Sequence, residues 1–326
     1  MSRTILAVLW LILATPAALA NGAIAERKTG GLVFKQSDTV SILSEDLAVS
    51  LTKITVDYLY KSEADAAQTV TIAFPMAAVP VNDDPGSLRE ILDGSTDGAT
   101  PENYMRFKVV VDGQDVEAEP FARALVKDKD ITEKITKAGL PLHMLVDDAN
   151  ALLKKLPKAR LDELIALGAI GQGESYGEPT YWPQWDYQVF FEWRQAFRPG
   201  ETKVSISYVP LAGFPADVGD AYEVGEWADA ACVDAVVRAA IAKRKAKGNA
   251  YYEVATVGYV LTTAKYWKGP IRSFNLSVEK PDDKTLAAFC PPEEKKVSPT
   301  RFEWHATDFV PEADLSVIFY TFQEPE

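Results

Sequence analysis

Histidine and cysteine are scarce in this sequence, since each occurs only twice among 326 residues. The two histidines, His143 and His305, lie far apart, and neither an HExxH pattern nor a paired-cysteine ligand set accompanies them. The sequence therefore predicts no metal centre. Glycine motifs of the GxGxxG or Walker type are also absent, so nucleotide cofactors have no support. We expect no cofactor.

Basic residues are fewer than acidic ones, with 34 Lys and Arg against 47 Asp and Glu and a formal net charge of -13. Such a protein has no broad basic field, which makes nucleic acid and anionic membrane surfaces poor partners. Apolar residues make up 47% of the chain and charged residues 25%, a composition that supports a sizeable core and excludes a disordered acidic tail.

Long apolar runs are absent beyond the N-terminal segment, which has the features of a signal peptide. Arg3 supplies a positive charge, residues 5–13 are apolar, and Ala18-Leu19-Ala20 has the small-x-small pattern of a cleavage site. The alternative is a retained membrane anchor, for which the apolar stretch is short. We expect residues 1–20 to be removed and the remainder to be periplasmic or secreted, with no membrane span after cleavage.

Export makes a disulfide the favoured interpretation of the two cysteines. Cys232 and Cys290 are an even pair without a CxxC spacing, and an oxidising compartment favours their pairing. Two buried thiols are the alternative. The bridge would join a helix to the end of a strand.

Apolar and polar residues alternate with a period of two over most of the chain, which predicts strands. Asp112-Gly113 predicts a two-residue hairpin turn. The period becomes helical at about 127–170 and again at about 226–247. We therefore predict a mainly β, β-rich α+β fold, with antiparallel sandwich-like sheets, a helical insertion and one later helix. Residues 21–326 are expected to form one unit; the alternative is a domain boundary within residues 171–183.

Two stretches, residues 56–75 and 189–210, share one pattern of two alternating strands that end at or just before a proline. We interpret them as two related long hairpins.

Gly173-Glu174-Ser175-Tyr176-Gly177 matches G-x-S-x-G, the nucleophile elbow of serine hydrolases. The elbow needs a strand before the serine and a helix after it, whereas a helix is predicted before Ser175 and prolines follow it. We therefore interpret this segment as a flexible glycine-rich loop. His305 lies in a predicted strand, where we expect a solvated or hydrogen-bonded histidine.

Aromatic residues are concentrated in residues 181–193. Four of them are spaced two or four positions apart, so that they share one face of a strand and are expected to pack in the core: Trp185, Tyr187, Phe191 and Trp193. This leaves Tyr181, Trp182 and Phe190 as exposed candidates, and Trp267, next to Gly269-Pro270, is added to them. Exposed rings can contact a protein partner or stack on a glycan.

Short motifs spread over nearly the whole mature chain resemble the bacterial exported family called domain of unknown function 4424. The motifs that carry the resemblance are Gly30-Gly31-Leu32, Ser44-Glu45-Asp46-Leu47, Phe74-Pro75-Met76, Phe191-Glu192-Trp193-Arg194-Gln195, Tyr208-Val209-Pro210, Tyr259-Val260-Leu261-Thr262-Thr263, Trp267-Lys268-Gly269-Pro270-Ile271, Phe289-Cys290 and Asp308-Phe309-Val310-Pro311. The resemblance implies an exported protein with one shared architecture, and it brings no activity, substrate or catalytic residue.

These observations predict an exported, non-catalytic binding or scaffold protein of the bacterial envelope. The alternatives are a carbohydrate-binding protein that uses exposed aromatic residues, a serine hydrolase that uses Ser175, and a purely structural envelope component.

Overall fold

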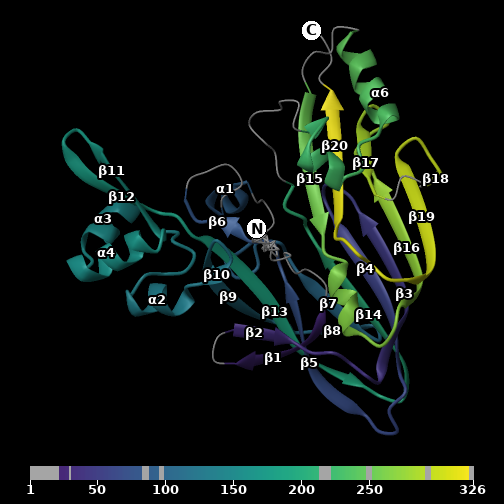
Figure 1. Ribbon diagram of the computed structural model, residues 1–326. Coiled ribbons are helices and arrows are strands. Elements are labelled where there is room, and N and C mark those ends of the chain that lie inside the picture. The colour runs from purple at the N-terminus through teal and green to yellow at the C-terminus, as the bar shows by residue number, and fades with distance from the viewer. Residues whose placement is uncertain are drawn as a thin grey trace, which may run out of the picture.

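The computed structural model describes residues 22–28, 31–82, 88–94, 99–212, 222–246, 252–290 and 295–322 (Figure 1). The predicted signal segment, residues 1–20, lies outside them. None of the described helices is long and apolar enough to cross a membrane.

Among the described residues, most strands belong to two large sheets. The first sheet has the order β10-β9-β13-β5-β1-β2, with β6 also pairing with β13. Its strands are β1 (Ala23–Lys28), β2 (Gly31–Phe34), β5 (Gln68–Pro75), β6 (Val79–Pro80), β9 (Glu119–Val126), β10 (Lys129–Asp130) and β13 (Asp186–Phe197). The second sheet has the order β18-β19-β16-β3-β4-β14-β7-β8. Its strands are β3 (Val40–Val49), β4 (Ile54–Ser62), β7 (Lys108–Val111), β8 (Gln114–Val116), β14 (Gly200–Tyr208), β16 (Ile271–Glu279), β18 (Lys295–Lys296) and β19 (Arg301–Phe309).

A smaller sheet, with the order β15-β20-β17, and a separate hairpin complete the β structure of the described chain. These strands are β15 (Tyr252–Tyr259), β17 (Leu286–Phe289) and β20 (Leu315–Phe322), and the hairpin strands are β11 (Ile170–Ser175) and β12 (Glu178–Pro183). The helices are α1 (Leu88–Asp93), α2 (Thr132–Lys137), α3 (Ala149–Lys154), α4 (Lys158–Ala166), α5 (Glu226–Ala230) and α6 (Ala235–Lys245), with a 3-10 turn at Thr262–Tyr266.

The strand-rich, mainly antiparallel fold confirms the predicted fold class. Every pairing between the described strands is antiparallel except that of β3 with β16. The predicted Asp112-Gly113 hairpin is also present, because it joins β7 to β8 with Val111 opposite Gln114.

The two predicted long hairpins are not hairpins. β4 lies in the second large sheet and β5 in the first, while β13 lies in the first and β14 in the second. β13 pairs with β5 and β14 pairs with β4, so each connection crosses between the layers. Alternation along a strand identifies the buried face but not the partner strand, which explains the error.

Aromatic side chains fill the space between the layers. Phe74 of the first sheet contacts Tyr208 of the second, with ring centroids 5.7 Å apart, and Phe107 stacks on Phe191 at 4.4 Å. The third sheet is buried on both sides: Val317 and Phe319 of β20 belong to this central core, whereas Ile318 and Tyr320 pack with residues of α5 and α6.

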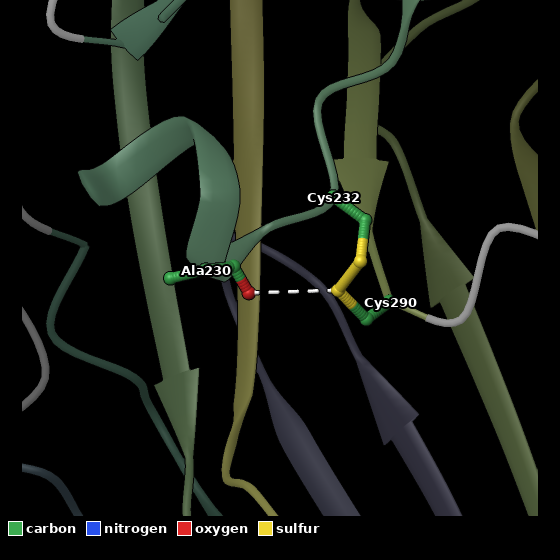
Figure 2. The surroundings of a disulfide bond; sticks show 3 residues. All are labelled: Ala230, Cys232 and Cys290. Carbon is green, nitrogen blue, oxygen red and sulfur yellow. Dashed lines mark hydrogen bonds between the residues drawn. A yellow bond between two sulfur atoms is a disulfide. The ribbon is translucent and has the colours of Figure 1, made fainter. Parts of the chain in front are cut away.

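The predicted later helix is two helices. α5 ends at Ala230 and α6 begins after Asp234, whose carboxylate accepts a hydrogen bond from the Val237 amide at 2.8 Å and caps the new helix. Between them Cys232 has a left-handed backbone, with φ of 49°. The predicted disulfide to Cys290 is present, with the two Cα atoms 5.2 Å apart (Figure 2). It joins this interhelical turn to the residue that follows β17.

The predicted helical insertion is confirmed, because α2, α3 and α4 all lie within residues 127–170. The insertion continues into the β11–β12 hairpin. We call residues 131–183, which follow β10 and end with β12, the arm; Figure 1 shows it extending to one side of the large sheets, with the hairpin at its far end.

Candidate functional site

The end of the arm carries a regular β-hairpin rather than the flexible loop that we expected. Ser175 pairs with Glu178, so Tyr176 and Gly177 form a two-residue turn. Both turn residues have positive φ, 52° and 83°, as a type I′ turn requires. The glycine-rich composition was therefore misread, since the glycines belong to a strand and its turn.

Ser175 does not lie in a nucleophile elbow. It ends strand β11 and is followed by the turn and by strand β12, whereas the elbow is a strand-to-helix turn. Its side chain is exposed at the end of the arm. The G-x-S-x-G match is therefore explained by the hairpin sequence.

Trp182 lies flat on the backbone of the opposite strand. It is 39% exposed and pairs with Gly171, where an added Cβ atom would lie 2.3 Å from the indole ring. A Cβ at Gly173 would lie 3.3 Å from the same ring. The two glycines therefore allow the indole to lie across β11, where it presents an apolar surface to solvent.

The outer edge of β12 cannot pair with another strand. Because Ser175 and Glu178 close a two-residue turn, the amide groups of residues 179, 181 and 183 point away from β11. Pro179 and Pro183 have no N–H, and the Tyr181 N–H donates to Asn150 Oδ1 of α3 at 2.9 Å. Two prolines and one side-chain acceptor thus block this edge.

The outer edge of β11 is different. Gln172 and Glu174 direct their amide and carbonyl groups away from β12, and both residues are exposed. Within the described chain, no hydrogen bond to either of these backbone groups is found outside the hairpin. The hairpin therefore has one closed and one open edge.

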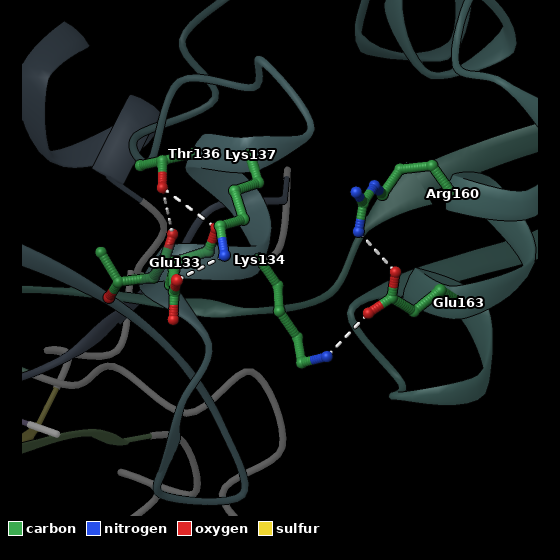
Figure 3. A network of polar contacts seen from close by, with 7 residues as sticks. Glu133, Lys134, Thr136, Lys137, Arg160 and Glu163 are labelled. Carbon is green, nitrogen blue, oxygen red and sulfur yellow. Dashed lines mark hydrogen bonds and ion pairs between the residues drawn. The ribbon is translucent and has the colours of Figure 1, made fainter.

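Ion pairs fix the helices that support the hairpin (Figure 3). Glu163 of α4 accepts hydrogen bonds from Lys134 of α2 at 2.7 Å and from Arg160 at 2.5 Å. The Lys134 ammonium, with help from Arg160, holds the pKa of Glu163 below its usual value. The pairs are exposed and individually weak, and the Lys134–Glu163 pair links α2 to α4.

The arm is also packed against the body of the protein. Ile135, Leu153 and Leu164 are fully buried. The Trp185 indole N–H donates to the Leu142 carbonyl at 2.8 Å and so fixes the turn after α2. His143 lies in this turn and accepts a hydrogen bond from the Leu145 amide at 3.1 Å, which gives it a local structural role.

The tip of the hairpin is acidic and aromatic. Tyr176 is fully exposed between Glu174 and Glu178, and residues 170–183 contain no Lys or Arg. A tyrosine in the left-handed region is unfavourable unless contacts compensate it, and a fully exposed ring makes few contacts.

Two of the four aromatic residues that we expected to be exposed are buried. Phe190 is only 1% exposed, because Phe121 and Arg123 of the neighbouring strand β9 cover it, with Arg123 4.4 Å from its ring centroid. Trp267 is 2% exposed. Its ring packs on Tyr60 at 4.7 Å, and its N–H donates to the Gly22 carbonyl at 3.2 Å. Tyr181 is partly buried and Trp182 is exposed. The two are consecutive residues of β12, so their side chains lie on opposite faces of the hairpin, and the structure does not bring the four candidates onto one surface.

A polar row crosses the outer face of the second large sheet. His305, Asn275, Asp46, Asp57 and Ser205 occupy paired positions on five successive strands, beside a cleft of about 700 Å³. His305 Nδ1 lies 2.6 Å from Asn275 Oδ1, and Asn275 donates to Asp46 at 2.5 Å. His305 is thus the hydrogen-bonded strand histidine that we expected.

A buried carboxylate, Glu45, precedes Asp46 on β3 and lies on the opposite face of that strand. Glu45 is fully buried, and the hydroxyls of Tyr58 and Tyr259, which are 2.8 Å apart, both lie 3.5 Å from its Oε1. Burial, together with the charge of Glu45, raises the pKa of both tyrosines well above the usual value. No sequence motif marks this cluster; the only signal is that Glu45 alternates with polar positions in the same way as the buried Leu47 and Val49.

Tyr176 is a second residue that the sequence motifs do not mark. Its position before Gly177 is a weak signal, because Asn or Asp is the usual residue there in a type I′ turn. Asp112-Gly113 fits that pattern, whereas Tyr176-Gly177 departs from it.

The described residues contain no group of three or more His, Cys, Asp and Glu residues suited to hold a metal ion. The hairpin offers hydrogen-bonding edges, carboxylates and aromatic surface, which are the elements of a binding surface.

Comparisons with known proteins identify the family. No curated protein matches the chain. A crystal structure from Legionella pneumophila, described as a "putative nutrient binding protein", is 14% identical and covers 91% of this chain and 72% of its own, with a TM-score of 0.43. Similarity at this level supports no conclusion about function. The family model described as "Domain of unknown function (DUF4424)" matches residues 20–318, as the sequence motifs predicted, and the chain therefore belongs to that family.

Proposed function

We propose that this protein is an exported, non-catalytic binding or scaffold protein of the bacterial envelope, and that the end of the arm contacts a protein partner. The observation that carries the proposal is the fully exposed Tyr176 in a left-handed turn position. Exposed aromatic residues are typical anchors of protein interfaces. The disulfide and the predicted signal peptide support export.

The charge of the tip indicates the kind of partner. Glu174 and Glu178 flank Tyr176 without a basic residue in the hairpin, so a partner surface with Lys or Arg around an apolar pocket is complementary. Trp182 adds an apolar surface along β11. A glycan partner, which would stack on Trp182 and Tyr176, is the alternative.

Site-specific photocrosslinking tests the proposal. A photoreactive phenylalanine analogue replaces Tyr176 in one variant and Lys127 in the matched control, because the exposed Lys127 occupies the corresponding position of the two-residue turn between β9 and β10. The exported variants are irradiated in intact cells. We expect a discrete protein adduct from position 176 and none from position 127.

Competition with added purified protein tests whether the adduct comes from a specific contact. Excess purified wild-type protein, added to an envelope fraction, should suppress the adduct, whereas the Tyr176→Asn protein should not. Raising the salt concentration should weaken it, because the contact is charged. Equal labelling from both positions, or an adduct that Tyr176→Asn suppresses as well as wild type does, would contradict the proposal. An adduct whose added mass is removed by glycosidases would favour the glycan alternative instead.

A further inference from the structure

We propose that the open edge of β11 accepts an extended segment of the partner as an additional antiparallel strand, and that this segment alternates basic and apolar residues. The inference rests on the proposed function, since it specifies how the end of the arm binds. It follows from the difference between the two edges of the hairpin and from the side chains on its two faces.

The hydrogen bonds of the hairpin show which backbone groups of β11 point outward and are available for pairing. Gln184 donates to the Ala169 carbonyl at 2.8 Å, and Tyr181 donates outward to Asn150 at 2.9 Å. Both bonds fit the same alternating pattern, in which the backbone N–H and C=O groups of residues 169, 171, 173 and 175 point toward β12. The outward groups of exposed β11 are therefore those of Gln172 and Glu174.

The outer edge of β12 is protected against strand pairing, whereas the outer edge of β11 is not. A two-stranded hairpin in water is marginally stable, and exposed edges invite pairing. Prolines at positions 179 and 183 prevent pairing along β12. Residues 170–175 of β11 contain no proline and no lysine, the residues that protect exposed edges.

The faces of β11 specify the incoming side chains. In an antiparallel pair, residues directly opposite each other place their side chains on the same face. A residue opposite Glu174 thus lies beside its carboxylate, which favours Lys or Arg. A residue opposite Gly173 lies on the other face, where the Trp182 indole covers β11, which favours an apolar side chain.

The same geometry shows which backbone amides of the incoming segment form hydrogen bonds with β11. The residues opposite Gln172 and Glu174 exchange hydrogen bonds with β11, so these are the basic residues of the segment. The apolar residues direct their amides away from β11. Both the hydrogen-bonding pattern and the side-chain pattern are therefore fixed by one register.

The first test uses a synthetic probe, the capped octapeptide Val-Lys-Val-Lys-Val-Lys-Val-Lys, and the full mature protein labelled with 15N. Binding is followed by the amide shifts of Gln172 and Glu174. N-methylation of the lysine amides should weaken binding at least about tenfold, because it removes the donors that face β11. N-methylation of the valine amides should change binding less than about threefold, because those donors face away.

The second test changes the protein. Gln172→Pro removes the outward N–H without altering a group that pairs with β12, and Gln172→Ala is the matched control that keeps it. We expect the proline variant to lose peptide binding and the adduct formed from position 176, and the alanine variant to keep both. Retained protection of the Gly173 and Thr180 amides shows that the hairpin is intact.

The outcomes separate the two proposals. An adduct from position 176 that survives Gln172→Pro overturns strand addition and leaves the proposed function standing. Peptide binding with the expected N-methyl pattern, but without an adduct in cells, supports strand addition and counts against the proposed function. Equal effects of both N-methylation patterns overturn strand addition. So does dimerisation through Gln172 and Glu174 without peptide, because the occupant would then be a second copy.

Discussion

The β7–β8 and β11–β12 hairpins have the same turn in opposite surroundings. Asp112 and Gly113 have φ of 48° and 80°, close to the 52° and 83° of Tyr176 and Gly177. Asp112 is held by β14, because its carboxylate accepts from the Lys203 amide and its amide donates to the Lys203 carbonyl, both at 2.9 Å. Tyr176 projects into solvent from a hairpin that pairs with no other described strand.

The comparison separates a structural residue from a candidate functional one. Asp suits the left-handed position and makes hydrogen bonds there, so folding accounts for Asp112. Tyr is unfavourable at the same position and is fully exposed in the described structure, so folding does not account for Tyr176. A residue that folding does not explain points to binding.

The largest effect is expected at the disulfide, which ties the chain covalently, whereas the β11–β12 hairpin is held by non-covalent contacts alone. Cys232→Ser or Cys290→Ser should lower the free energy of unfolding by about 2 to 4 kcal/mol, since the bond closes a loop with a sequence separation of 58. The double change should cost little more than either single one, because all remove the same bond. Thermal and denaturant unfolding of the exported variants measure this.

The disulfide prediction has two controls. Alkylation under denaturing conditions without reductant should find no free thiol in the wild-type protein. Amide exchange at Glu178 should be unchanged in the serine variants, because the bond ties the α5–α6 turn and not the arm. Two alkylated thiols, or loosening of the hairpin, would contradict it.

A second prediction places the same change in both turns. Gly113→Ala and Gly177→Ala each force alanine into a left-handed position, at a local cost of about 1 to 2 kcal/mol. Because β7 pairs with β14, we expect Gly113→Ala to lower global stability. Gly177→Ala should leave the global unfolding midpoint unchanged and accelerate exchange only in β11 and β12. Equal shifts of the midpoint would show that the arm and body unfold together.

A third prediction concerns the packing of the Trp182 ring on β11. Gly171→Ala places a Cβ atom where the indole lies, so the ring must move off β11. We expect no change in global stability and a loss of binding to the alternating peptide of at least about threefold, because the apolar surface is removed. Gly173→Ala is the milder matched change, since its Cβ would lie 3.3 Å from the ring. The amide shifts that follow peptide binding also report the movement.

Alternation and turn chemistry predicted much of the fold. They located the strands, the helical insertion and the Asp112-Gly113 turn, because these depend on residues close in sequence. The partners of β4 and β13 depend on how the layers close, which local patterns do not encode. The break at Cys232 was missed because the helical period of residues 226–247 continues through it, and only the cap at Asp234 marks the new start.

The candidate site was predicted only in part, for the same reason. Parity assigned Trp185 and Trp193 to the core correctly, but β13 is covered on both faces, so Phe190 is buried as well. Trp267 precedes a Gly-Pro turn, which suggested exposure, whereas it packs between the sheets. Exposure at Tyr176 arises because the hairpin stands apart from the sheets, which no local pattern shows.

The smallest effect, and the one that separates folding from binding most directly, is expected for Tyr176→Asn. Asparagine suits the left-handed position, so the hairpin should become more stable by up to about 1 kcal/mol, and exchange at the Glu178 amide should slow by about two- to fivefold. The reciprocal change, Asp112→Tyr, should destabilise its own turn, because it removes the bond to Lys203. Binding should respond in the opposite direction, since Tyr176→Asn removes the anchor and should abolish the adduct in the competition experiment. If Tyr176→Asn instead loosens the hairpin, tyrosine has a structural role there and the contrast between the two turns does not indicate a binding site.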